Sequence, residues 1–120
     1  MNQRPIPACR LVPRLRILCG EEVALGPGKA DLLAAIAETG ELRRAAAHLG
    51  MSYMRAWKLV QTMNRCFREP LVETVRGGAR RGAARLTPTG RLAFSLYTRM
   101  ERQSLSATRA AFARLARLIR

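Results

Sequence analysis

The side chains best suited to chemistry in this sequence are its arginines. They make up 20 of the 22 basic residues, against only 8 acidic residues in 120, so the formal net charge is +14. A guanidinium is permanently charged, and its planar fork donates paired hydrogen bonds to phosphate or to a guanine edge. Because an excess charge of this size attracts polyanions, the composition favours nucleic acid as a partner, ahead of an anionic membrane surface.

Side chains for catalysis or metal binding are scarce. His48 is the only histidine, and the three cysteines, Cys9, Cys19 and Cys66, are widely spaced and form no C-x-x-C pair. A structural zinc site needs about four nitrogen or sulfur ligands at short spacings. Acid–base catalysis needs clustered titratable groups. We therefore expect free thiols, no metal, no cofactor and no enzymatic activity.

The first third of the chain predicts a leader, a hairpin and a helix. Three prolines interrupt residues 1–13, which we interpret as an extended leader. Residues 14–25 alternate polar and apolar side chains around a turn, as in a short hairpin. Gly26, Pro27 and Gly28 follow this hairpin. From Lys29 to Gly40, apolar residues recur at helical spacing.

Two helices joined by a tight turn come next. The first is expected from Glu41 to Leu49 and ends at Gly50, because glycine adopts the left-handed conformation that terminates helices. Ser52 is placed to cap the following helix, which Pro70 ends. Its apolar face contains Ala56, Val60, Met63 and Phe67, and its polar face contains Arg55, Lys58, Gln61, Thr62 and Arg65. This pair is a helix-turn-helix candidate.

A second hairpin follows this pair. Residues 71–76 and 85–86 are strand-like, and we interpret the glycine-rich segment between them, residues 77–84, as a hairpin tip that carries Arg80 and Arg81. The order helix, helix, turn, helix, hairpin, helix is that of a winged helix-turn-helix. We therefore predict a mainly α fold with a small β-wing, in which residues 14–90 form the DNA-binding domain.

The last part of the chain predicts a long helix. Thr87 and Pro88 are a strong start signal, an N-cap followed by proline in the first turn. Residues 91–120 continue this helix, but their two apolar stripes do not share one heptad register. We therefore expect a bend near residues 104–106.

This arrangement predicts which residues reach DNA. A recognition helix fits the major groove of B-DNA, where its N-terminal residues meet base edges. Arginines on the wing would lie along the backbone or in the minor groove. Eleven basic and two acidic residues lie between Arg43 and Arg91, a net charge of +9. The predicted DNA contacts are Arg43, Arg44, Ser52, Tyr53, Met54, Arg55, Lys58, Arg80 and Arg81.

A set of motifs between about residue 28 and residue 100 identifies a family. They are Ser52-Tyr53-Met-Arg-Ala56-Trp57, Met63-Asn64, Leu71-Val-Glu73, Gly77-Gly78 and Ala84-Arg-Leu-Thr-Pro-Thr-Gly90. Together they resemble the N-terminal DNA-binding domain of the molybdate-responsive ModE regulators. The LysR-type winged helix is similar more distantly, through Ala45-Ala46, Leu49, Ser52 and Leu86-Thr-Pro-Thr-Gly90.

The resemblance implies a sequence-specific, homodimeric transcription regulator whose last helix, within residues 91–120, helps to build the dimer interface. The interface residues expected on that helix are Leu96, Tyr97, Met100, Leu105, Phe112 and Leu115. Glu41 stands where the family usually has a capping serine, so a weaker cap is expected there. The family's molybdate-binding domains are absent from these 120 residues. We therefore expect no direct molybdate sensing, and a separate partner chain that senses a ligand is an open alternative.

Two other functions stay open. A general basic module that coats DNA or RNA would share the charge and lack the sequence preference. The basic segment Arg99 to Arg120 could instead bind a membrane surface or a protein, although its misaligned stripes reduce its amphipathic character. The sequence has no signal peptide and no apolar run of about 18 residues. We therefore expect a cytoplasmic protein that binds double-stranded DNA and no membrane.

Overall fold

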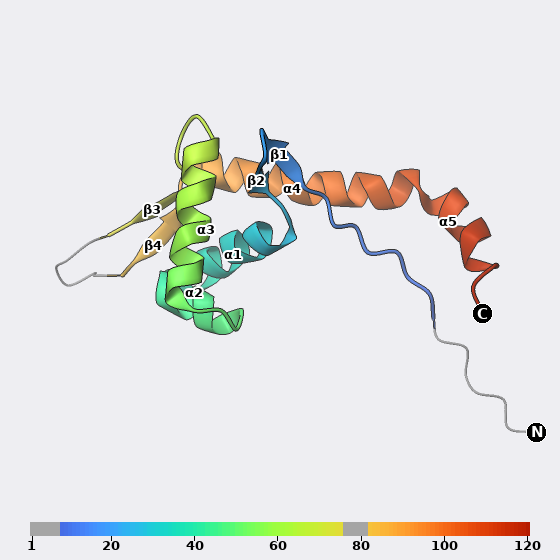
Figure 1. Ribbon diagram of the computed structural model, residues 1–120, viewed down its shortest axis with the longest axis horizontal. Helices are drawn as coiled ribbons and strands as arrows, with labels where there is room; N and C mark the ends of the chain where they lie inside the picture. Colours follow the sequence, from blue (N-terminus) through green and yellow to red (C-terminus); the bar gives the residue numbers. More distant parts are fainter. Residues whose placement is uncertain (1–7, 76–81) are drawn as a thin grey trace, which may run out of the picture.

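The chain folds as a helix-turn-helix unit with two small hairpins and a long final helix (Figure 1). The computed structural model describes residues 8–75 and 82–120. Its elements are, in order, β1 (Ile17–Cys19), β2 (Glu22–Leu25), α1 (Pro27–Thr39), α2 (Leu42–His48), α3 (Tyr53–Cys66), β3 (Val72–Thr74), β4 (Ala84–Leu86), α4 (Pro88–Ala107) and α5 (Arg109–Ala116). Both hairpins are antiparallel. The predicted mainly α fold with a small β-wing is confirmed.

The core is aliphatic and is centred on α1, which packs against α2, α3 and α4. Leu32, Leu33 and Ile36 of α1 are almost completely buried, as the helical spacing of the sequence indicates. One aromatic side chain from the final helix joins them. Tyr97 is 1% exposed, and its hydroxyl donates to the Leu15 carbonyl oxygen at 2.8 Å. This bond ties the segment before β1 onto α4.

The turn between α2 and α3 forms as predicted. Gly50 has φ +69°, in the left-handed backbone region that residues other than glycine rarely adopt. The next residue, Met51, donates its N–H to the Ala46 carbonyl oxygen at 3.0 Å. Ser52 then caps α3, because its side-chain oxygen accepts the Arg55 N–H at 3.1 Å. The two helices are thus fixed by backbone and cap hydrogen bonds.

Helix α1 begins earlier than the sequence indicated. We expected a helix from Lys29, but α1 starts at Pro27, with Gly26 as its extended N-cap. Proline suits the first helical turn, since the N–H groups there have no helical acceptor and its fixed φ is already helical. The predicted helix start was therefore two residues too late.

The final helix breaks close to the predicted bend. The break lies at Thr108, between α4 and α5, rather than within 104–106. The Thr108 hydroxyl donates to the Ser104 carbonyl oxygen at 2.6 Å, and its ψ of 1° departs from helical geometry. In Figure 1 the two helices change direction at this point and lead away from the end of the molecule that carries α3 and the β3–β4 hairpin.

Several predicted features lie outside the described residues. They are the first seven residues of the leader, the end of the predicted strand at Arg76, the motif Gly77-Gly78 and the two arginines Arg80 and Arg81. Residues 8–16 form neither helix nor strand. Of the helices in residues 8–75 and 82–120, none combines the length and the apolar character that crossing a bilayer requires.

Candidate nucleic-acid interface

The first two turns of α3 present polar and cationic side chains on the surface. Tyr53, Met54, Arg55 and Lys58 are exposed there, whereas the opposite face of the helix is buried in the core. Met54 is 56% exposed, which is a large fraction for an apolar side chain. These four residues are called the exposed row of α3. The Ser52 cap fixes the start of the helix from which they project. The described residues thus place the predicted recognition surface on one helix face.

Two of the predicted contact residues touch each other across the helix-turn-helix. Arg43 lies in the first turn of α2 and Tyr53 is the first residue of α3. The guanidinium carbon of Arg43 lies 4.9 Å from the centroid of the Tyr53 ring. This distance is that of a cation–π interaction. It joins α2 to the exposed row of α3.

The neighbouring arginine is placed differently. Arg44 Nε lies 2.9 Å from the Glu41 carboxylate, an exposed ion pair. Glu41 is the N-cap of α2, and its side chain makes no cap hydrogen bond. The weaker cap expected from Glu41 is therefore confirmed, and the carboxylate pairs with Arg44 instead.

The wing is attached to the helix-turn-helix at its root. Ala84 of β4 donates its N–H to the Gly40 carbonyl oxygen at 2.9 Å, and the Leu42 N–H donates to the Gly82 carbonyl oxygen at 3.3 Å. The segment between α1 and α2 thus pairs with the residues just before β4 through a single antiparallel bridge, between Glu41 and Ala83. Because of these bonds, the described part of the wing and the start of α2 form one unit.

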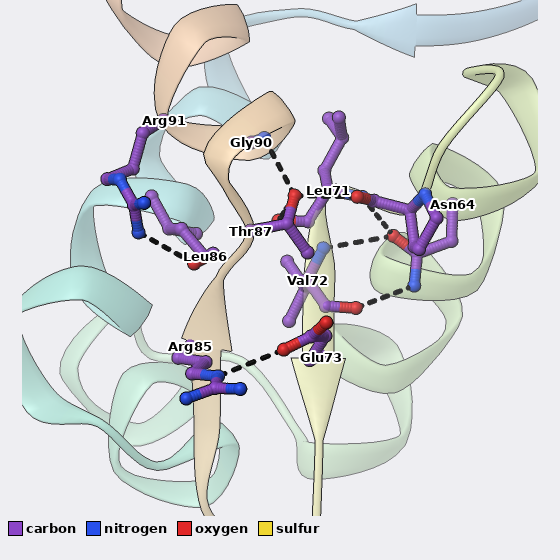
Figure 2. Close-up of polar contacts among 10 residues, drawn as sticks. Asn64, Leu71, Val72, Glu73, Arg85, Leu86, Thr87, Gly90 and Arg91 are labelled. Atoms are coloured by element: carbon purple, nitrogen blue, oxygen red, sulfur yellow. Dashed lines mark hydrogen bonds and ion pairs between the residues drawn. The ribbon is translucent and has the colours of Figure 1, made fainter.

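A second attachment joins the wing to α3 (Figure 2). Asn64, in the last turns of α3, accepts the Leu71 and Val72 N–H groups at its side-chain oxygen, at 2.9 and 3.2 Å. Its side-chain nitrogen donates to the Val72 carbonyl oxygen at 3.0 Å. Asn64 belongs to the Met63-Asn64 motif, but nothing in the sequence alone indicates this structural role. The position of β3 relative to the exposed row of α3 depends on this amide.

The start of α4 also contacts the segment that leads into β3. The Thr87 hydroxyl donates to the Pro70 carbonyl oxygen at 2.7 Å, and its oxygen accepts the Gly90 N–H at 2.9 Å, which confirms the predicted cap. A Cβ on Gly90 would overlap the Leu71 carbonyl oxygen. Only glycine therefore permits this approach. The joint of Asn64, Leu71, Thr87 and Gly90, here called the wing joint, connects α3, β3 and α4 (Figure 2).

The first hairpin supports the far end of α3. Arg65 donates from its guanidinium to a Glu22 carboxylate oxygen at 2.6 Å, and the Cys66 thiol lies 3.5 Å from the other oxygen. The hydrogen bond from Arg65 holds the pKa of Glu22 below its ordinary value. Burial, together with the Glu22 carboxylate, raises the pKa of the Cys66 thiol. Arg65, expected on the polar face of α3, is therefore occupied by this hairpin.

The residues expected at a dimer interface are not equally available. Tyr97 is a correction, because it lies in the core of its own chain with its hydroxyl bonded to Leu15. Phe112 is half-buried. The other expected residues, Leu96, Met100, Leu105 and Leu115, are exposed, and so is Leu92, which the sequence analysis did not select. Leu92, Leu96 and Met100 follow one another at four-residue spacing and form a single stripe on α4.

The described residues offer little for metal binding. Within 8–75 and 82–120, no group of three or more histidine, cysteine, aspartate or glutamate side chains is arranged to hold an ion.

Comparison with known proteins places this architecture in a family. The model of the family described as bacterial regulatory helix-turn-helix protein, lysR family, matches residues 29–91, more than half of the chain. The molybdenum transport protein ModE of Azotobacter vinelandii is 36% identical over 100 residues, which cover 83% of this chain and 37% of that protein. The molybdenum-pterin-binding protein MopB of Rhodobacter capsulatus is 40% identical over 77 residues, 64% of this chain and 28% of that protein. The chain thus spans 37% and 28% of the lengths of these two relatives.

Solved structures show the same fold. The protein chain in the crystal structure of the CbnR_DBD–DNA complex matches with a TM-score of 0.55 at 20% identity, over 74% of this chain and 94% of that one. The chain in the BenM_DBD/benA site 1 DNA complex matches with a TM-score of 0.53 at 17% identity, over 74% of this chain and 93% of that one.

Proposed function

The chain belongs to the LysR family of bacterial regulatory helix-turn-helix proteins, and from this membership we propose that it is a sequence-specific transcription regulator that binds double-stranded DNA. In this proposal α3 enters the major groove with its first two turns against the base edges. Arg55 binds a guanine through O6 and N7, and Lys58, one turn on, binds a base or phosphate. The wing, with Arg80 and Arg81 at its tip, follows the adjacent backbone or minor groove.

The exposed row at the start of α3 carries this proposal. Arg55 and Lys58 are exposed, and no ion pair within the described residues uses either of them. By contrast, Arg44, Arg65 and Arg85 each have a carboxylate partner. A cation without a protein partner keeps its charge available for a phosphate or a base edge. This difference in ion pairing supports Arg55 and Lys58, rather than the paired arginines, as the proposed DNA contacts.

The same proposal includes a homodimer built on α4. The stripe of Leu92, Leu96 and Met100 is exposed on a helix of 20 residues, although these side chains are apolar. Burial against the same stripe of a second copy would remove this apolar surface from water. A two-fold dimer would then read two related half-sites.

Binding to DNA fragments tests the proposal. Fragments selected from the source genome by the purified chain are compared with scrambled duplexes of the same length by fluorescence anisotropy, at near-physiological salt. We expect the selected duplex to bind about a thousandfold or more tightly than the scrambled one. Affinity that never exceeds that for the scrambled duplex would rule out sequence-specific binding.

The net charge of +14 supports a second candidate, a general basic module for nucleic acid. Two substitutions separate the candidates. Under the first proposal, Arg55→Ala relaxes the preference at one base pair, whereas Arg80→Ala weakens all sequences alike. An equal and uniform loss from both substitutions would favour the general module.

A further inference from the structure

We propose that Arg43 and Tyr53 act as one unit that grips a phosphate group of the DNA backbone, with the tyrosine ring holding the guanidinium in place before DNA arrives. This inference rests on the proposed DNA-binding function and assigns a specific task to two residues within it. Their juxtaposition across the helix-turn-helix is the observation that carries it.

The geometry leaves the guanidinium free to bind. Its carbon lies over the ring of Tyr53, 4.9 Å from the ring centroid, so the ring contacts the guanidinium without accepting a conventional hydrogen bond from its N–H groups. The N–H donors of arginine lie in the plane of the group and point outward from its edge. No hydrogen bond or ion pair within the described residues engages these donors. An edge of two parallel N–H groups matches two oxygens of one phosphate.

Arg44 lacks this arrangement, although it is adjacent in sequence. Its Nε lies 2.9 Å from the Glu41 carboxylate, which neutralises the local charge and occupies the donor. Both Arg43 and Arg44 were predicted to contact DNA. The structure distinguishes them, since Arg43 is held by a neutral ring and Arg44 by an acid.

The position of the pair favours a phosphate rather than a base. Arg43 projects from the start of α2, beside the first residue of α3 and not from the face of α3 itself. A helix that precedes the recognition helix crosses the DNA backbone in this architecture. Restricting the long arginine side chain before binding reduces the entropy that binding removes. Tyr53 is thus a positioning residue for Arg43.

A double-mutant cycle on DNA affinity tests this pair. The variants are Arg43→Ala, Tyr53→Leu and the double variant, with Arg44→Ala and Tyr53→Phe as matched controls. We expect Arg43→Ala to weaken binding to all duplexes and to reduce the log–log salt slope by about one. Tyr53→Leu should weaken binding about two- to fivefold, in line with an exposed cation–π interaction. The double variant should bind no more weakly than Arg43→Ala alone.

The controls decide between alternatives. Tyr53→Phe keeps the ring and should lose less affinity for DNA than Tyr53→Leu, whereas a loss as large as that of Tyr53→Leu would show that the hydroxyl contacts DNA and would overturn the positioning role. Losses that add in the double variant, or a loss from Arg44→Ala equal to that from Arg43→Ala, would also overturn the inference.

A measurement without DNA separates this inference from the proposed function. In the free protein, the Tyr53 ring should shift the Arg43 Cδ proton resonances upfield, and Tyr53→Leu should abolish the shift. An unchanged spectrum would overturn the pairing even if the chain binds DNA normally. A chain that shows the shift but binds no duplex would instead overturn the proposed function and the phosphate contact with it.

Discussion

The Asn64 side-chain amide binds both polar backbone groups of Val72: it accepts the Val72 N–H at 3.2 Å and donates to the Val72 carbonyl oxygen at 3.0 Å. This is the pair of hydrogen bonds that a neighbouring strand would supply. A single amide side chain on α3 therefore takes the place of a strand next to β3. The wing and the proposed recognition helix are held in one relative position by this contact.

Replacing this amide should loosen the wing. Asn64→Ala removes hydrogen bonds to Leu71 and Val72 and leaves their backbone groups without these partners. We expect a loss of about 1–3 kcal/mol in the free energy of unfolding, measured by urea denaturation. Asn64→Asp keeps the accepting oxygen and should lose less. Equal stability of Asn64→Ala and the unchanged chain would contradict the role of the amide.

A glycine pair tests the close approach at the wing joint. In Gly90→Ala the new methyl group would overlap the Leu71 carbonyl oxygen, so backbone must move. We expect a loss on the order of 1–3 kcal/mol in stability, measured by thermal or urea unfolding. Gly28→Ala is the matched control, because it is also near a helix start and has nothing within 4 Å. That variant should be unchanged or up to about 1 kcal/mol more stable.

Helix ends were predictable from the sequence where they depend only on residues close to one another in the chain. Ser52 and Thr87 were expected to be caps, and both accept the N–H three residues on. Gly50 was expected to end a helix and has the positive φ that this requires. The start of α1 at Pro27 was missed because a proline between two glycines is typical of both a turn and a helix start.

The contacts between distant segments were not predictable. Nothing in the order of residues indicates that Arg43 meets Tyr53, because this contact crosses from α2 to α3. Tyr97 has the spacing of an interface residue, yet its hydroxyl meets the Leu15 carbonyl, 82 residues away in sequence. Such contacts depend on how the elements pack against one another, and residue types and their spacing do not indicate that packing.

The proposed dimer can be tested on the α4 stripe. Leu96→Glu places a charge in the centre of this stripe and should convert a dimer into monomers in sedimentation experiments. Leu118→Glu serves as the control, since Leu118 is 82% exposed and lies beyond α5. An unchanged dimer in Leu96→Glu, or a monomer in the unsubstituted chain, would exclude an interface built on this stripe.

Tyr97 should contribute to the pH dependence of stability. Burial raises the pKa of its hydroxyl above the ordinary value of 10.0, so the neutral form is favoured in the folded chain. Its contribution is fully present below that value and is lost as the pH rises through the folded pKa. Tyr97→Phe should unfold about 1 kcal/mol more readily at neutral pH and show a shallower decline above pH 10. Parallel curves for the two proteins would contradict this.

The attachment of the wing root to the segment between α1 and α2 bears on how such a protein can diverge. Gly40 and Leu42 end one helix, begin another and pair with the wing, so a change there disturbs three elements at once. Arg55 and Lys58 make no side-chain contact of this kind among the described residues. Under the proposed function, exchanging these two outward-facing side chains would change the DNA sequence that is bound and leave the hydrogen bonds of the wing root in place.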